Sequence, residues 1–261
     1  MTATISEPAL ADAVVRLRAA GCVFAEEEAD ILAAAAADEQ SLDALVDRRA
    51  QGEPLEQVVG YADFCGVRVR LRPGVFVPRV RSELLVRLAG ERATSDTVLV
   101  DLCCGSGALG LAVRHRHPGV ELHAADLDPV AVECARDNLG DNVHQGDLFD
   151  ALPGDLRGRI TLLLANVPYV ATRHIPFLPA EAKDHEPNLA LDGGADGLDV
   201  FRAVVAAAPV WLAPGGLLLS EITEAQEEPA AAALRAAGLT AEVVHDRDLE
   251  ARVIQGGRSM R

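Results

Sequence analysis

Apolar and polar positions divide the chain into a helical beginning and a longer stretch in which strands and helices alternate. In the longer stretch, apolar runs predict strands at residues 97–103, 120–126, 160–165 and 217–222, with a shorter strand near Val143. Segments with helical spacing separate these runs, so we expect a parallel sheet with helices on both faces, a Rossmann-like α/β fold. The run at residues 160–165 is apolar throughout, which predicts a central strand that is buried on both sides.

The first part of the chain has a different pattern. Residues 8–50 have apolar positions at helical spacing and predict three helices, the third of which is capped by Ser41. Residues 67–71 then alternate apolar and basic positions, and we expect residues 75–77 to pair with them across a turn at residues 72–74. This pairing predicts a β-hairpin that links the helices to the α/β part.

The end of the chain completes the predicted organisation. Two short strands, at residues 242–245 and 252–254, are expected to pair as an antiparallel edge of the sheet. The whole pattern predicts three parts: a helical domain at residues 1–50, a β-hairpin linker at residues 51–90 and an α/β domain at residues 91–261.

Composition narrows the possible partners. The net charge of -16, from 24 basic and 40 acidic residues, argues against tight binding to a nucleic-acid backbone. The five cysteines are dispersed, which suits a reducing compartment, and no spacing of residues predicts a metal site. The start of the chain lacks the features of a signal peptide, and no stretch reaches the roughly twenty apolar residues of a membrane span. We therefore expect a cytoplasmic protein with no membrane partner, and the sequence leaves its oligomeric state open.

The first candidate site is a turn that follows the strand at residues 97–103. It runs from Asp101 through two cysteines to Gly105 and Gly107, and a helical pattern begins at Ala108. Glycines allow a sharp turn and the close approach of a ligand, and the free N–H groups of the next helix favour negative charge. A tight turn without a ligand gives the same local pattern, so the surrounding residues have to decide between the two interpretations.

Two acids further along the chain favour a ligand. Asp126 ends the second predicted strand, where an acid binds ribose hydroxyls in doubly wound sheets. An acid four residues before the glycine pair is typical of S-adenosylmethionine (SAM) methyltransferases, and this register disfavours a nicotinamide oxidoreductase. We predict SAM as the cofactor, with Asp101, Gly105, Gly107 and Asp126 as binding residues. Asp147, after the third strand, is expected beside the adenine amine, with a solvated turn acid as the alternative.

The second candidate site is the tetrapeptide Asn166-Val167-Pro168-Tyr169, which follows the central strand. Ligands of open α/β sheets bind beyond the carboxyl ends of the strands, so this segment is expected next to the cofactor. An ordinary Asn-x-Pro turn is the alternative. The long loop at residues 166–197 favours a functional role, since such loops are uncommon in compact domains.

With these two sites in place, the chain resembles the protein-(glutamine-N5) methyltransferases that modify peptide-chain release factors. Five motifs in order carry the resemblance, from about residue 50 to residue 222: Pro54-Leu55-Glu56-Gln57 with Gly60, Phe64 and Gly66; Phe76-Val77-Pro78-Arg79 with Ser82-Glu83; the Asp101 to Gly107 turn; Asn166-Val167-Pro168-Tyr169; and Glu186-Pro187-Asn188 through Gly193-Gly194 with Asp196-Gly197-Leu198. The resemblance implies a SAM-dependent enzyme and a protein substrate such as a release factor.

The chemistry of an amide acceptor suggests roles for the tetrapeptide. We expect Asn166 Oδ1 and the Val167 carbonyl to accept both N–H bonds of a glutamine side chain, which would hold its nitrogen toward the methyl donor. Tyr169 would pack on the amide plane or near the developing positive charge. We therefore predict Asn166, Pro168 and Tyr169 as catalytic residues and Asn166 to Tyr169 as the substrate-binding segment, with Asn166 also next to the cofactor.

The sequence departs from the family pattern in three places. The family's tetrapeptide is usually Asn-Pro-Pro-Tyr, the segment from Pro78 to Arg81 lacks a second proline, and the helical domain is short. Arg79 faces either the donor, the substrate or a surface ion pair. These departures leave alternatives to glutamine methylation open: an amine of a nucleobase or a small metabolite as the acceptor, or a catalytically silent SAM-binding module.

Overall fold

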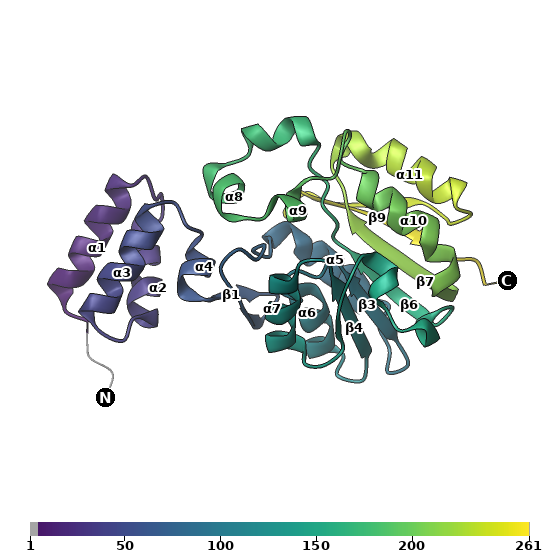
Figure 1. Cartoon of the computed structure of the whole chain (residues 1–261), viewed down its shortest axis with the longest axis horizontal. Helices are drawn as coiled ribbons and strands as arrows, with labels where there is room; N and C mark the ends of the chain where they lie inside the picture. Colours follow the sequence, from purple (N-terminus) through teal and green to yellow (C-terminus); the bar gives the residue numbers. More distant parts are fainter. Residues whose placement is uncertain (1–4, 261) are drawn as a thin grey trace.

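The structure is a computed structural model that describes residues 5–260. Figure 1 shows a lobe of helices at the N-terminal end beside a larger α/β body, with the C-terminal end on the far side. The helices are α1 (Glu7–Ala19), α2 (Ala25–Ala35), α3 (Glu39–Ala50), α4 (Leu55–Val59), α5 (Glu83–Gly90), α6 (Ala108–Arg116), α7 (Pro129–Leu139), α8 (Ala180–His185), α9 (Asn188–Leu191), α10 (Asp199–Trp211) and α11 (Glu227–Ala236). The strands are β1 (Tyr61–Phe64), β2 (Val67–Arg70), β3 (Val98–Leu102), β4 (Glu121–Asp126), β5 (Val143–Gln145), β6 (Ile160–Ala165), β7 (Leu212–Glu221), β8 (Glu242–Asp246) and β9 (Ala251–Gly257).

Seven strands form the main sheet in the order β5-β4-β3-β6-β7-β9-β8. The first five strands in this order run parallel, and β9 pairs antiparallel with both β7 and β8. The predicted parallel sheet, its central strand β6 and its antiparallel edge are therefore confirmed. Because β3 and β6 are neighbours although β4 and β5 lie between them in sequence, the order of strands reverses at this point of the sheet.

Alternate residues of the central strands pack on opposite faces. Val100 and Leu163 belong to a core that also contains Phe201 of α10 and Leu234 of α11. Leu99 and Leu164 belong to a second core on the side of α5, α6 and α7. Both faces of the sheet are thus buried, which is why its strands read as continuous apolar runs (Figure 1).

The N-terminal helices have a core of their own. Leu17, Leu32, Leu42 and Val46 are fully buried there. The cap of α3 differs from the prediction: Asp38 is the N-cap residue, and its side chain accepts a hydrogen bond from Ser41 N. Ser41 lies three residues further on and completes a capping box with its hydroxyl, so a serine suited to the cap position occupies the first turn instead.

The predicted hairpin exists, but its second partner was wrong. β1 pairs with β2, and Tyr61 is opposite Arg70, whereas residues 75–77 form no strand. Cys65 and Gly66 both have positive φ, 50° and 83°, which is the geometry of a tight two-residue hairpin turn. Residues 75–77 instead form a loop, which Gln57 holds by a hydrogen bond from its Nε2 to the Val75 carbonyl at 2.9 Å.

The predicted long loop at residues 166–197 contains short helical turns, α8 and α9 among them. It passes over the edge of the sheet where β3, β4, β6 and β7 end, close to α4 and the hairpin (Figure 1). This is the edge at which the strand order reverses, where ligands of open α/β sheets bind. No helix within residues 5–260 is both long and apolar enough to cross a bilayer.

Candidate functional site

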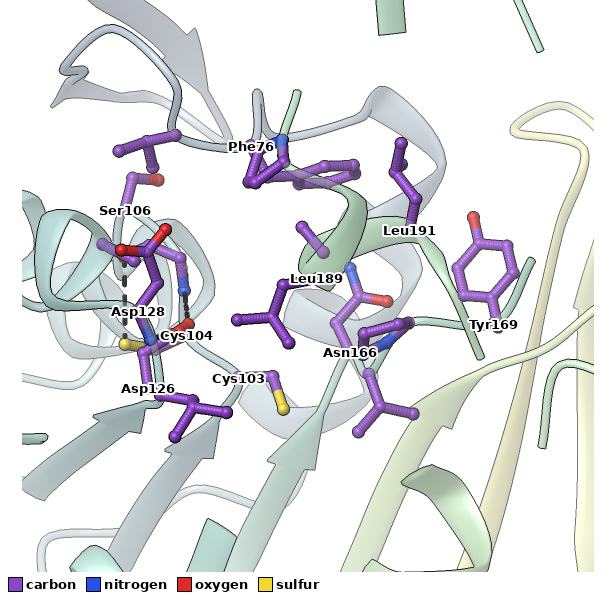
Figure 2. Close-up of a pocket in the computed structure, with 18 of the residues that line it drawn as sticks. Phe76, Cys103, Cys104, Ser106, Asp126, Asp128, Asn166, Tyr169, Leu189 and Leu191 are labelled. Carbon is purple, nitrogen blue, oxygen red and sulfur yellow. Dashed lines mark hydrogen bonds between the residues drawn. The ribbon is translucent and has the colours of Figure 1, made fainter. Parts of the chain in front are cut away.

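A cavity of about 410 Å³ lies at the carboxyl edge of the sheet. Its walls come from segments far apart in sequence and contain most of residues 74–82, 103–109 and 125–131, all of residues 146–148 and 166–170, and parts of residues 178–200. Figure 2 shows Cys104, Ser106 and Asp126 on one side and Asn166 and Tyr169 on the other. The volume is in the range of sites for small molecules and cofactors.

The turn after β3 forms one wall, and its two glycines have different environments. Gly105 has φ +55°, and a Cβ atom placed on it would meet no atom within 4 Å, so its backbone is open to the cavity. Gly107 has φ +75° and caps α6, but a Cβ there would lie 2.7 Å from Leu139 Cδ1 of α7. Gly105 therefore permits the approach of a ligand, whereas Gly107 permits the packing of α7 against the turn.

Asp126 links the turn to the end of β4. Its Oδ2 accepts a hydrogen bond from Gly105 N at 2.8 Å, and its Oδ1 accepts one from Asp128 N at 3.0 Å. Burial raises the pKa of Asp126, and these two hydrogen bonds oppose that rise. Each carboxylate oxygen has a second lone pair, so the group can still accept hydrogen bonds from a ligand in the cavity.

The other two predicted acids differ in position. Asp147 is exposed and lines the cavity. Asp101 is fully buried below the turn; its Oδ2 accepts a hydrogen bond from Gly110 N at 3.0 Å, and its Oδ1 has no partner among the described residues. Burial, together with the charge of Asp126, raises the pKa of Asp101 to about 7. Asp101 and Gly107 lie outside the cavity lining, and contact of either one with a ligand stays a prediction.

Asn166 and Val167 form the opposite wall at the end of β6 (Figure 2). Asn166 Nδ2 donates a hydrogen bond to Ser82 Oγ at 3.4 Å, while its Oδ1 is buried and has no partner among the described residues. Val167 is 2% exposed, and no donor within residues 5–260 reaches its carbonyl. The wall therefore contains two acceptors without a partner at adjacent positions, a combination that suits a ligand with two N–H donors.

Tyr169 is fixed at both its side chain and its backbone. Its hydroxyl donates to Glu221 Oε1 at 2.7 Å and accepts a hydrogen bond from Arg81 Nη2, and its carbonyl accepts from Gln226 Nε2 at 2.9 Å. Burial, and then the neighbouring Glu221 carboxylate, raises the pKa of Tyr169 above its usual value. The phenol hydroxyl therefore keeps its proton at neutral pH.

Two glycines of the long loop pack against the backbone of the tetrapeptide. A Cβ on Gly193 would lie 2.6 Å from the Pro168 carbonyl oxygen, and one on Gly197 would lie 2.2 Å from the Tyr169 carbonyl oxygen. Gly193 N also donates a hydrogen bond to the Val170 carbonyl at 2.9 Å. Close approach of two backbones thus accounts for the glycines at positions 193 and 197 of the loop.

Arg79 forms an ion pair with a buried acid, Glu186. Its Nη2 contacts both carboxylate oxygens of Glu186 at 2.7 Å, and Glu186 Oε1 also accepts from Val77 N at 3.2 Å. Glu186 is 5% exposed and belongs to the long loop, so this ion pair fastens the loop over the segment that contains Phe76.

Four side chains of the site have roles that were not predicted from the sequence: Ser82, Glu186, Glu221 and Gln226. Glu221 had a visible signal, because it is an acid at the end of the apolar run at residues 217–222, where a buried charge needs partners. The partners themselves had no signal, since they lie more than fifty residues away in sequence.

The family model described as "Methyltransferase small domain" matches residues 66–176. A release factor glutamine methyltransferase of Geobacter sulfurreducens is 36% identical over 189 residues, which cover 70% of this chain and 66% of that protein. One from Moorella thermoacetica is 36% identical over 202 residues, covering 74% of this chain and 70% of that protein. The matches thus span about two thirds of the length of these relatives.

Another relative has a different acceptor in its name. The 4-amino-L-phenylalanine/4-methylamino-L-phenylalanine methyltransferase of Streptomyces pristinaespiralis is 37% identical over 203 residues, which cover 74% of this chain and 69% of that protein. Among solved structures, a 16S rRNA N2 G1207 methyltransferase of T. thermophilus, in complex with AdoMet and guanosine, has a TM-score of 0.53 at 20% identity. That match covers 76% of this chain and 49% of the other, and it shows the fold alone.

Proposed function

The chain belongs to the release factor glutamine methyltransferase family, and from this premise we propose that it methylates the side-chain amide of a glutamine in a protein substrate, with SAM as the methyl donor. The observation that carries the proposal is the pair of unused acceptors, Asn166 Oδ1 and the Val167 carbonyl, in the cavity wall opposite the glycine turn. A primary amide has two N–H donors on one nitrogen, and few other groups of a protein match this pair.

The turn side of the cavity fits SAM. Gly105 leaves room for the cofactor next to the backbone, Asp126 has free lone pairs for ribose hydroxyls, and Asp147 lines the cavity beyond the end of β5. Asp101 would act through the turn that it supports. SAM supplies a methyl group on a positively charged sulfur, which an otherwise weak nucleophile can attack.

The residues of the tetrapeptide would position the acceptor. With Asn166 Oδ1 and the Val167 carbonyl accepting its two N–H bonds, the amide nitrogen is held in one orientation and turned toward the donor side. Both acceptors also stabilise positive charge that develops on the nitrogen as it is alkylated. The alkylated nitrogen is strongly acidic, so it would release one of its two protons to water and leave a neutral N-methyl amide. Pro168 restricts Val167 to extended backbone, and Tyr169 closes the wall beside it.

A release factor is the first candidate for the protein substrate, because the relatives are named for that activity. The acidic composition supports a protein over a nucleic acid. We propose that an N-terminal domain at residues 1–50, which contains α1 to α3, and a linker at residues 51–90 form the part that meets the substrate, beside a catalytic domain at residues 91–261. Arg49 of α3 supports this arrangement, since its Nη1 contacts Glu181 Oε1 of the cavity wall at 2.7 Å.

A second candidate is N-methylation of a small aromatic amine. A relative named for 4-amino-L-phenylalanine is as similar to this chain as the release factor enzymes are. The cavity wall also contains apolar side chains that suit an aromatic ring, among them Phe76, Leu178 and Leu189. An arylamine has two N–H donors as well, so the acceptor pair alone fits both substrates.

One experiment separates the two candidates. The purified protein is incubated with methyl-labelled SAM and either a release factor from a bacterial translation system or 4-amino-L-phenylalanine, and the products are located by mass spectrometry. We expect a single methyl group on a glutamine side chain of the release factor. Labelling of the amino acid alone would select the second candidate. Absence of product with both substrates, despite SAM binding by calorimetry, would contradict the proposed activity.

A further inference from the structure

The acceptor wall is the side of the cavity formed by residues 166–169, and Asn166 and Tyr169 are its two polar side chains. Glu221 binds the Tyr169 hydroxyl directly and reaches Asn166 through Ser82. It lies at the end of β7, next to the end of β6, and is 3% exposed. Its Oε2 accepts a hydrogen bond from Ser82 Oγ at 2.8 Å, and its Oε1 accepts from Tyr169 OH and from Arg81 Nε, each at 2.7 Å. Ser82 in turn is the partner of Asn166 Nδ2 at 3.4 Å.

We propose that Glu221 and Ser82 are positioning residues that fix which end of the Asn166 amide faces the acceptor, and this proposal rests on the proposed function. Two hydrogen bonds join these side chains and form the Glu221–Ser82–Asn166 relay: Ser82 donates to Glu221, and Asn166 donates to Ser82. The tetrapeptide fixes the position of Asn166 at the end of β6. The relay fixes the orientation of its amide, so that Oδ1 and not Nδ2 faces the substrate nitrogen.

The direction follows from the number of protons available. A carboxylate has no proton to give, so the hydrogen bond between Ser82 and Glu221 uses the single hydroxyl proton of Ser82. Ser82 Oγ then has only lone pairs left for Asn166, and it accepts a proton from Nδ2. If the Asn166 amide were reversed, its Oδ1 would face Ser82 Oγ, whose only proton is already bonded to Glu221. Two buried oxygens would then face each other without a proton between them, which is unfavourable.

This direction matters for the reaction. An acceptor amide or amine offers N–H protons, so it needs an oxygen in the wall. Were the Asn166 amide reversed, its NH₂ group would face the NH₂ group of the substrate, and binding in the reactive orientation would fail. The same carboxylate holds the Tyr169 hydroxyl, so one buried acid sets two of the side chains of the tetrapeptide.

Substitutions that keep the size of a side chain test the orientation of the Asn166 amide without changing the shape of the site. In Glu221→Gln, the amide nitrogen can donate to Ser82 Oγ, which frees the serine proton to bond Asn166 Oδ1 and favours the reversed amide. We expect kcat to fall at least tenfold, with SAM affinity by calorimetry unchanged. Ser82→Ala removes the preference without reversing it, so a smaller loss of about fivefold is expected. Ser82→Thr keeps the hydroxyl and should restore kcat.

A double-mutant cycle distinguishes the relay from a general loss of structure. When the Ser82 hydroxyl is absent, no hydrogen bond connects residue 221 to Asn166, so the Glu221→Gln change cannot reverse the Asn166 amide. Adding Ser82→Ala to Glu221→Gln should therefore not lower kcat further. Thr97→Val is the control, because it removes a buried hydroxyl at the opposite end of the sheet. Losses that multiply in the double variant, or a Glu221→Gln variant as active as the wild type, would overturn the relay.

A readout without turnover keeps the test separate from the proposed function. In protein labelled with ¹⁵N asparagine, the side-chain amide protons of Asn166 should exchange slowly in the wild type and in Ser82→Thr, and quickly in Ser82→Ala. Fast exchange in all three would overturn the relay even if glutamine is methylated. Slow exchange in a wild type that methylates no glutamine would support the relay and reject the glutamine acceptor.

Discussion

The two walls of the cavity are built in different ways. The turn after β3 is built locally: the backbone at Gly105 leaves room, the Asp126 carboxylate holds Gly105 N, and the two residues lie at or within three residues of the ends of β3 and β4. The acceptor wall is made by side chains, and its hydrogen bonds join Asn166 and Tyr169 to Ser82 and Glu221 from other segments. The first wall depends on the absence of a side chain at its glycines and on one carboxylate, whereas the acceptor wall depends on hydrogen bonds between side chains that are distant in sequence.

Behind each wall lies one buried acid, Asp101 or Glu221, and the hydrogen-bond partners of the two acids differ. Asp101 has a single backbone hydrogen bond, from Gly110 N, and one oxygen without a partner. Glu221 has three side-chain donors, one of which is the guanidinium of Arg81. Hydrogen bonds therefore offset little of the cost of burying the Asp101 carboxylate and most of the cost of burying the Glu221 carboxylate. The wall formed by the turn after β3, the turn wall, thus has an electrostatic cost that the acceptor wall avoids.

The largest effect is expected from Asn166→Ala, which damages the acceptor wall alone. Loss of a positioned acceptor should lower kcat by about 10²- to 10³-fold, while SAM affinity stays close to wild type because Gly105 and Asp126 are untouched. Steady-state kinetics and calorimetry measure the two quantities. Asn142→Ala, at an exposed asparagine before β5, is the matched control. A parallel loss of SAM affinity would show that the walls are not independent.

The next effect is a contrast between two glycines of the turn wall. Gly107→Ala combines a positive φ with a Cβ 2.7 Å from Leu139 Cδ1, so we expect a loss of about 2–3 kcal/mol in the free energy of unfolding. Gly105→Ala meets no atom within 4 Å and should cost about 1 kcal/mol. Its methyl group points into the cavity, however, and should weaken SAM binding about tenfold or more. Urea unfolding and calorimetry would contradict this assignment if the two variants behaved in the opposite way.

Asp101→Asn tests the electrostatic cost of the turn wall. The pKa of Asp101 is raised from 3.8 to about 7, so the folded protein binds more protons than the unfolded chain between these values, and stability falls as the pH rises through them. The full shift corresponds to about 4 kcal/mol, of which we expect about half after relaxation of the buried site. From about pH 4.5 to about pH 8, Asp101→Asn should therefore gain about 2 kcal/mol relative to wild type in urea unfolding. Asp150→Asn, at an exposed acid, should gain nothing; equal pH dependence of all three proteins would contradict the prediction.

The difference between the walls also explains which of them the sequence could reveal. The turn wall was predictable because its determinants are local: an apolar run, two glycines at fixed spacing and an acid at the end of the next strand. The tetrapeptide was predictable for the same reason. The relay was not, because Ser82 and Glu221 are 139 residues apart and meet only when α5 and β7 are packed.

The errors in the secondary structure have the same origin. Residues 75–77 alternate like a strand, but the competing run at residues 61–64 is nearer and is joined to β2 by the favourable turn at Cys65 and Gly66. Ser41 is a good cap residue by type, yet Asp38, three positions earlier, already satisfies the free N–H groups of α3. In both cases two nearby signals competed, and only the packed chain decided between them.

The smallest effect is expected from Val167→Pro, which changes the backbone of the acceptor wall and keeps both of its hydrogen-bond acceptors. Proline would confine Asn166 to extended geometry, and no described residue accepts a hydrogen bond from Val167 N, so the lost donor costs little. If preorganisation of Asn166 limits the reaction with glutamine, kcat should rise about two- to fivefold, which is the equivalent of 0.4–1 kcal/mol. Val170→Pro is the contrasting control, because Val170 N donates to the Leu191 carbonyl at 3.0 Å and its loss should detach the long loop. A lower kcat in Val167→Pro, with SAM affinity unchanged, would instead indicate that valine is adapted to another acceptor and would favour the small aromatic amine.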